Sequence, residues 1–212
     1  MGETCAFCED RPQYRDRRTG QFVCLEHARL EVVAPTTQST LTRPLNIRPA
    51  VTTEGKRHGG TVGTQIEALS LLFWDETDVD CFERCYDVLA CPSFVAWDGD
   101  EVGGMASYAL EVDWDALVLV MLNVLPAYQR RGTGWALLDA VRGEAARRSL
   151  GRILVTTSND DLPALAIYQR YGFRITRVIP GSIARHHGGE LPGFAGIPVR
   201  DEIRLEYRLA GG

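Results

Sequence analysis

A chain of 212 residues is long enough for one well-buried core with a small additional module. With 45% apolar and 24% charged residues, it has the composition of a globular protein, which excludes disordered, collagen-like and coiled-coil chains. The net charge of −5 argues against general binding to nucleic acids or anionic membranes.

The first residues are polar where a signal peptide would need an apolar segment. The most apolar run, residues 116–122, is shorter than the roughly 20 residues that a membrane-spanning helix requires. We therefore expect a cytoplasmic protein with no membrane partner. In a reducing compartment, clustered cysteines indicate a metal site more often than a disulfide.

Two short ligand pairs near the N-terminus predict a structural zinc site. The segments "CAFC" and "CLEH" supply three cysteines and one histidine, a set that closes a tetrahedral Cys3His site with no open position for catalysis. A module of residues 1–32 is too short to bury its own core, so zinc would supply most of its folding free energy. A redox Cys-x-x-Cys motif is the alternative. The predicted ligands are Cys5, Cys8, Cys24 and His27.

Zinc ribbons often bind nucleic acids, but residues 1–44 hold as many carboxylates as arginines. Such a balance disfavours phosphate binding and favours a docking or dimer element, so a homodimer is one expected assembly. Residues 33–44, rich in Thr, Ser and Pro, are predicted to be a linker, and residues 45–210 a second domain.

The second domain is predicted to be of mixed α/β class, because segments of helical and alternating periodicity follow one another along it. The apolar spacing of Val79, Phe82, Tyr86 and Leu89 favours a helix, which would place Cys81 and Cys85 one turn apart as buried apolar residues. The expected elements are a strand at 45–50, helices at 64–73 and 78–89, a hairpin at 93–112, a buried central strand at 116–125, a helix from about Gly134, a strand at 152–157, a helix from about Pro163, and strands at 173–179 and 202–209.

The segment "YQRRGTGWALL" follows the central strand and precedes a helix. Glycines allow close approach of the backbone, and a helix N-terminus favours negative charge, so the segment predicts a site for a phosphate-bearing ligand. The spacing Gln129-x-x-Gly132-x-Gly134 matches neither the P-loop nor the dinucleotide fingerprint. A simple helix entry is the alternative.

At these residues the sequence resembles the GNAT N-acetyltransferase superfamily. "LNVLPAYQRRGTGWALLDAV" resembles the acetyl-CoA-binding motif, and "DDLPALAIYQRYGF" resembles the segment that follows it in the same family. The resemblance covers about residues 45–209. It implies a GNAT-like mixed sheet with splayed central strands and flanking helices, acetyl-CoA as cosubstrate, and a small-molecule or protein amine as acceptor.

The resemblance also implies which residues contact the cofactor. Backbone amides from Arg130 to Gly134 would bind the diphosphate, and Val124 would pair with the pantetheine arm. Asp161 stands where many members carry an asparagine, so Asn159 is an alternative contact, and Asp160 or Asp161 could instead cap a helix. The cofactor-binding candidates are Asn123, Val124, Gln129, Arg130, Arg131, Gly132, Thr133, Gly134, Asn159 and Asp161.

Tyr168 matches the family's general acid, which would protonate the leaving thiolate; a packing role is its alternative, and Tyr171 is the second candidate. The N–H of Val124 is the expected oxyanion donor. The central strand offers no general base, so Glu76, with its neighbour Asp75, is the candidate. The loop between the last two predicted strands holds two histidines and a carboxylate, His186, His187 and Glu190. They would either reach the acceptor site or remain in solvent.

The predicted function is therefore acetyl transfer from acetyl-CoA to a primary amine by direct attack, since no serine or cysteine stands in a nucleophile context. One alternative is an acyl-CoA sensor or zinc-ribbon regulatory protein without turnover. Another is recruitment by the zinc module of a protein or RNA that is then acetylated. The acceptor is not identified by the sequence.

Overall fold

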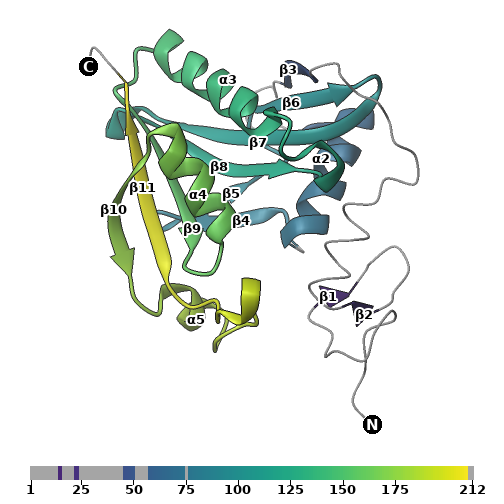
Figure 1. Ribbon diagram of the computed structural model, residues 1–212. Coiled ribbons are helices and arrows are strands. Elements are labelled where there is room, and N and C mark those ends of the chain that lie inside the picture. Colours follow the sequence, from purple (N-terminus) through teal and green to yellow (C-terminus); the bar gives the residue numbers. More distant parts are fainter. Residues whose placement is uncertain (1–13, 16–21, 24–44, 51–56, 75, 210–212) are drawn as a thin grey trace. The chain divides into compact units, whose positions relative to one another are not determined.

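The structure is a computed structural model that describes residues 14–15, 22–23, 45–50, 57–74 and 76–209 (Figure 1). In the part of the chain so described, no helix is long and apolar enough to cross a membrane.

The chain divides into two compact units, Met1–Arg43 and Pro44–Gly212. In the first, β1 (Tyr14–Arg15) pairs antiparallel with β2 (Phe22–Val23). All other helices and strands among the described residues belong to the second unit.

Within the described residues of the second unit, seven strands form one mixed sheet in the order β10-β11-β9-β8-β7-β6-β3. Only β8 and β9 are parallel, and every other neighbouring pair is antiparallel. The mixed α/β architecture expected from the sequence is confirmed. The strands are β3 (Asn46–Ala50), β6 (Ser93–Asp98), β7 (Glu101–Glu111), β8 (Ala116–Val124), β9 (Arg152–Ser158), β10 (Arg174–Ile179) and β11 (Glu202–Arg208).

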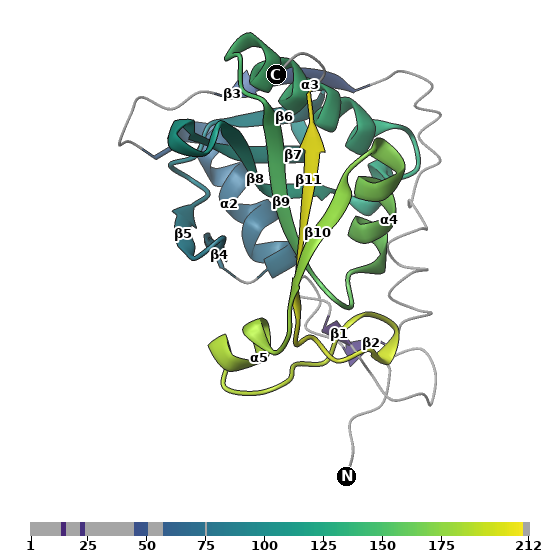
Figure 2. The same cartoon turned by 90° about the vertical axis from the view of Figure 1, so that its left-hand side faces the viewer.

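Helices cover both faces of the sheet (Figure 2). α3 (Thr133–Arg147) and α4 (Leu162–Tyr171) lie on one face, and α2 (Gly60–Trp74) lies on the other. Two apolar clusters fill the layers between them, one around Leu117 and Leu119 and the other around Val118 and Ile66. The nearly continuous burial of β8 follows from this arrangement and confirms the predicted central strand.

The second predicted helix, residues 78–89, is wrong. This segment forms a hairpin of β4 (Asp78–Cys81) and β5 (Arg84–Asp87). Phe82 and Glu83 at its turn have φ of 53° and 59°, the left-handed values that a two-residue type I′ turn requires at both central positions. Cys81 is buried and Cys85 is exposed, so the two thiols do not share a face.

An ion pair between the buried Arg204 and the exposed Glu83 joins the turn of the hairpin to the sheet. Arg204 of β11 is 9% exposed; its guanidinium contacts Glu83 at 2.6 Å and Glu202 at 2.7 Å and lies over the ring of Phe82. The hairpin therefore covers the same face of the sheet as α2 (Figure 2).

Strand β8 contains a bulge. Ser107 and Tyr108 of β7 lie opposite Met121 and Leu119, so Val120 is an extra residue in β8. Bulges of this kind bend a strand and occur often beside active sites.

The connection between β10 and β11, expected from the sequence to be a loop, contains two short helical segments. These are α5 (Ser182–His186) and the 3₁₀ turn η3 (Phe194–Gly196). Two more 3₁₀ turns flank β8: η1 (Val112–Trp114) and η2 (Pro126–Tyr128).

Candidate active site

Strands β8 and β9 separate halfway along their length. Their parallel pairing runs from Ala116 opposite Arg152 to Leu119 opposite Val155. Beyond this point β9 continues beside β11, while β8 continues beside β7 to Val124. The expected divergence of the central strands is confirmed, and it leaves one side of the end of β8 without a neighbouring strand.

The backbone of Val124 faces this gap. The N–H of the next residue, Leu125, donates to the carbonyl of Gly103 at 2.9 Å, toward β7. Successive residues of a strand direct their backbone groups to opposite sides, so the N–H and C=O of Val124 point away from β7. The side-chain amide of Gln129 donates to this carbonyl at 2.9 Å, while no strand in the described residues pairs with the N–H.

The loop before α3 presents a series of free backbone donors. Arg130 and Gly132 have φ of 60° and 84°, and no side chain caps the helix at Gly132. In the part of the chain that the structure describes, the N–H groups of residues 130–135 have no hydrogen-bond acceptor. The last four belong to the helix N-terminus, where the N–H groups point outward along the helix axis. This end of α3 is therefore suited to binding an anion.

Gly134 joins this loop to α4 and β8. A methyl group at Gly134 would lie 2.8 Å from Cδ1 of Ile167 and 3.9 Å from Cγ2 of Val124. The free N–H groups, the end of β8 and the residue before Tyr168 are therefore close together. A larger residue at this position would require the end of the Ile167 side chain to shift.

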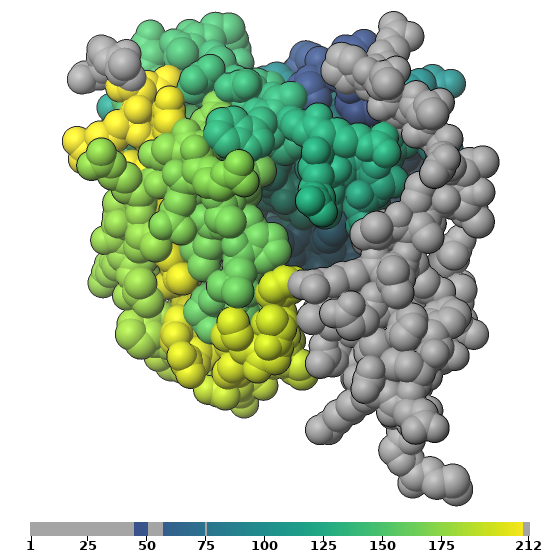
Figure 3. Space-filling view, viewed as in Figure 1, coloured from purple at the N-terminus to yellow at the C-terminus, as the bar shows by residue number. Residues whose placement is uncertain are grey.

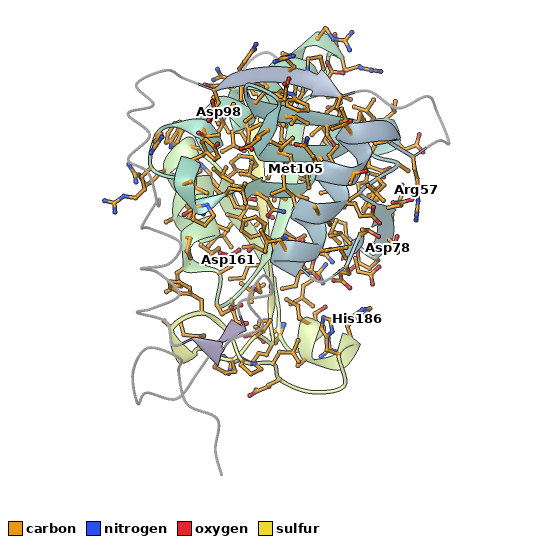
Figure 4. The ribbon with its side chains drawn as sticks, turned by 90° about the vertical axis from the view of Figure 1, so that its right-hand side faces the viewer. Arg57, Asp78, Asp98, Met105, Asp161 and His186 are labelled. Atoms are coloured by element: carbon orange, nitrogen blue, oxygen red, sulfur yellow. The ribbon has the colours of Figure 1, made fainter. Side chains whose placement is uncertain are left out.

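The loop is held in place by its polar neighbours. The hydroxyl of Thr133 donates to the carbonyl of Tyr128 at 3.0 Å, and the hydroxyl of Tyr128 donates to Asp98 at 2.9 Å. Asp98 is labelled in Figure 4. The side chains of Arg130 and Arg131 are exposed, so both cations are accessible to an incoming anion.

Tyr168 on α4 is 5% exposed and packs against Phe173. Its hydroxyl makes no hydrogen bond to any described residue. Burial raises the pKa of the Tyr168 hydroxyl above its ordinary value, and the carboxylate of Asp161 raises it further. The phenol therefore keeps its proton at neutral pH and can donate it.

Tyr171 has a different environment. Its hydroxyl donates to Asp139 at 2.8 Å, and its ring packs in a cluster with Trp135 and Phe173. Burial, followed by the bond to Asp139, raises the pKa of Tyr171. Since this hydroxyl is already engaged, Tyr168 remains the better candidate for the proton donor.

Asp161 and Asn159 have structural partners. Asp161 caps α4 by accepting the N–H of Ala164 at 3.1 Å, at the position labelled in Figure 4, and burial raises its pKa. The amide of Asn159 donates to the carbonyl of Pro198 at 2.9 Å and accepts the N–H of Asp201 at 2.9 Å. The contacts of both residues with a cofactor stay a prediction.

Asn123 is buried near the end of β8, and its side chain reaches α2. The indole N–H of Trp74 donates to Oδ1 of Asn123 at 3.1 Å. One signal for this contact is visible in the sequence, because a polar residue interrupts an apolar strand, but that signal does not identify the partner.

Glu76 lies in the connection between α2 and β4. The sequence predicted a connection between two helices here, which is wrong because residues 78–81 form a strand. Its carbonyl accepts the hydroxyl of Ser70 at 2.7 Å, and the same hydroxyl contacts Sδ of Met121 on β8 at 3.7 Å. The connection thus lies beside β8, and the side chain of Glu76 is exposed. Its neighbour Asp75 lies outside the described residues.

The histidines of the β10–β11 connection are exposed. Nε2 of His186 lies 3.3 Å from Oδ2 of Asp80 on β4, and the ring of His187 packs edge-on against that of His186. His186 is therefore close to the hairpin (Figure 4), while Glu190 is exposed.

The predicted zinc ligands Cys5, Cys8, Cys24 and His27 lie outside the described residues. Among the residues that are described, no group of three or more His, Cys, Asp or Glu side chains could hold a metal ion.

Comparison with known proteins places this site in a family context. Residues 90–175 match the family model described as an acetyltransferase (GNAT) domain. Among curated proteins, the chain is 32% identical over 116 residues to the uncharacterized protein YxbD of Bacillus subtilis (strain 168), covering 53% of this chain and 70% of that protein.

Solved structures agree with the fold. An IAA acetyltransferase from Bacillus cereus ATCC 14579 is 25% identical to this chain and has a TM-score of 0.58. The match covers 77% of this chain and 100% of that structure. A GNAT family acetyltransferase from Elizabethkingia anophelis with acetyl-CoA bound is 21% identical with a TM-score of 0.59, covering 77% of this chain and 99% of the other.

Proposed function

Since this chain belongs to the GNAT acetyltransferase family, we propose that it transfers the acetyl group of acetyl-CoA to a primary amine. The observation that carries the proposal is the run of free N–H groups at residues 130–135, beside the gap between β8 and β9. A thioester cofactor with a diphosphate and an extended amide-bearing arm matches both features.

The chain's own groups fit this cofactor in two places. The N–H groups from Arg130 to Gly134 bind the diphosphate, with Arg130 and Arg131 adding positive charge. The backbone of Val124 faces the gap in which the pantetheine arm would lie as an additional strand. Gln129 already donates to the Val124 carbonyl, so the arm shares this oxygen with Gln129 or displaces it.

Acetyl-CoA supplies an acyl carbon that an amine attacks, so that the C–N bond forms as the C–S bond breaks. The free N–H of Val124 stabilises the negative charge on the carbonyl oxygen. Tyr168 gives its proton to the departing thiolate. The proton lost by the amine goes to solvent or to the exposed carboxylate of Glu76 beside β8.

Direct attack is supported by the state of the described cysteines. Burial raises the pKa of Cys81 to about 12 and that of Cys91 to about 12. The pKa of the exposed Cys85 is also raised, by desolvation first and then by Asp80. These thiols therefore remain protonated at neutral pH, where they are poor nucleophiles.

A panel of primary amines incubated with the protein and acetyl-CoA tests the proposal, with release of free thiol as the measurement. We expect amine-dependent release for at least one class of amine, together with the acetylated product by mass spectrometry. Tight CoA binding without any amine-dependent release would instead indicate an acyl-CoA sensor.

We also propose, from sequence spacing alone, that Cys5, Cys8, Cys24 and His27 bind one structural zinc ion. Protein purified without chelators should contain about one zinc per chain by atomic spectroscopy, because such a site is fully liganded. Cys24→Ser should lower the zinc content, whereas the control Cys85→Ser should not. Zinc-free protein would contradict the proposal.

A further inference from the structure

Asn123 carries a buried hydrogen-bond donor without a partner. The residue is 4% exposed, and its Nδ2 is the one buried side-chain nitrogen or oxygen among the described residues that makes no hydrogen bond. Buried polar groups are almost always paired, so an exception needs an explanation.

The orientation of this amide is fixed by Trp74. An indole N–H can only donate, so the oxygen of Asn123 must face Trp74 and the nitrogen must face away. A flipped amide would place two donors against each other. The hydrogen bond from Trp74 thus directs the N–H donors of Asn123 away from the indole.

The location of the Trp74–Asn123 pair indicates that the amine substrate accepts this hydrogen bond. Asn123 is adjacent to Val124, whose N–H faces the gap, and successive side chains of a strand point to opposite faces of the sheet. Val124 packs in the cluster under α3 and α4, so Asn123 faces α2. The proposed diphosphate site is at the N-terminus of α3, which leaves the α2 side for the amine.

The end of α2 adds an apolar surface. Leu72, Phe73 and Trp74 are 51%, 38% and 46% exposed. Figure 3 shows a hollow between α4 and the segment that leads into α3, with the blue and dark teal colours of the α2-to-β8 part of the chain at its floor. Of these three side chains, Trp74 is the one in contact with Asn123, so an acceptor at this amide would meet the indole ring beside it.

We propose that Asn123 and Trp74 select an α-amino acyl acceptor, an amine whose neighbouring carbon carries a carbonyl group and an apolar side chain. This inference depends on the proposed acetyl transfer and assigns Asn123 to the acceptor instead of the cofactor. Nδ2 of Asn123 donates to the acceptor's carbonyl oxygen, and the apolar side chain packs on Trp74.

The class of acceptor follows from the short distance between Asn123 and Val124 along β8. Adjacent Cα atoms are about 3.8 Å apart, so the group bound by Asn123 must lie close to the amine that reacts beside Val124. An α-amine has its carbonyl two bonds away. The ε-amine of a lysine has its backbone carbonyl much further away, and a simple alkylamine has none.

Two acceptors that share a ring and a primary amine test the assignment: L-phenylalaninamide, which has the carboxamide, and 2-phenylethylamine, which lacks it. With concentrations counted as the unprotonated amine, because the α-amino amide is the weaker base, the wild-type protein should prefer the amide in kcat/KM by about tenfold, the effect of one hydrogen bond from a buried donor. Asn123→Leu should bring the ratio close to one. Both acceptors are compared on the same variant, so a loss of folded protein cancels.

Trp74→Phe is the second variant, in case Asn123→Leu does not fold. It keeps an aromatic surface but removes the N–H that orients the amide, so the ratio should also fall. Thr64→Ala, near the other end of α2, is the matched control and should keep the wild-type ratio.

Equal use of the two acceptors by the wild-type protein, or a preference that survives Asn123→Leu, would overturn the acceptor assignment and leave the proposed transferase activity intact. Acetylation of no amine at all would instead refute the proposed function, and the assignment with it.

Discussion

Replacing Tyr168 with phenylalanine should lower kcat by about 100-fold or more while the Kd for CoA stays unchanged. The phenol is buried, protonated and free of hydrogen bonds to any described residue, so its loss removes the proton donor and little packing. A fall in kcat without weaker binding is the signature of an interaction made in the transition state. Steady-state thiol release and calorimetric CoA binding measure the two quantities.

Tyr171→Phe is the control for this experiment. Its hydroxyl is bonded to Asp139, so the variant should lose some stability and keep a kcat close to that of wild type. The pH profile gives a further check: because the pKa of Tyr168 is raised above its ordinary value of about 10, its deprotonation should not lower kcat below that pH. A Tyr168→Phe enzyme with wild-type kcat would leave only a packing role for the ring.

Gly132→Asp should weaken CoA binding by about 100-fold. A Cβ at Gly132 meets no atom within 4 Å, but the φ of 84° strains any residue that has a side chain. Aspartate and asparagine adopt positive φ more readily than other such residues, so a comparison of the two variants separates the effect of charge from that of strain. The new carboxylate would stand among the free N–H groups and repel the diphosphate. Two like unit charges about 5 Å apart repel each other by about 3 kcal/mol at an effective dielectric constant of about 20. A loss of this size in binding free energy corresponds to about a 100-fold higher Kd.

Gly132→Asn is the matched control, because asparagine has the same shape and the same tolerance of positive φ without the charge. Its Kd for CoA, measured by calorimetry, should be much nearer to that of wild type. If the Asp and Asn variants bound CoA equally well, the anion would not bind at this loop.

Most of the fold was predictable because its elements carry strong periodic signals. The central strand was identified by its continuous apolar run, and β6 and β7 by the turn between them. The hairpin β4–β5 was missed because its sequence satisfies two periods at once. Val79, Phe82 and Tyr86 have helical spacing, but Val79, Cys81 and Tyr86 also fall on one face of a hairpin, and the turn at Phe82 contains no glycine to indicate it.

The candidate site was predictable where it is local in sequence. Residues 129–134 are contiguous, and their glycines and arginines indicate an anion site directly. The contact between Asn123 and Trp74 joins residues far apart in the chain, so it depends on how α2 packs on the sheet. In the same way, only the structure shows that Gln129 reaches the carbonyl of Val124.

The extra residue at Val120 changes the parity of β8. Leu117 and Leu119 belong to the cluster under α3 and α4, and so do Leu122 and Val124, although the two pairs are an odd number of residues apart. Without this extra residue, the side chains after the bulge would exchange faces: Leu122 and Val124 would point toward α2, and Asn123 toward α3 and α4. The number of residues in β8 is therefore as much a constraint on this protein as their identity. Deleting one residue would leave the composition of the strand almost unchanged but would turn Asn123 toward α4.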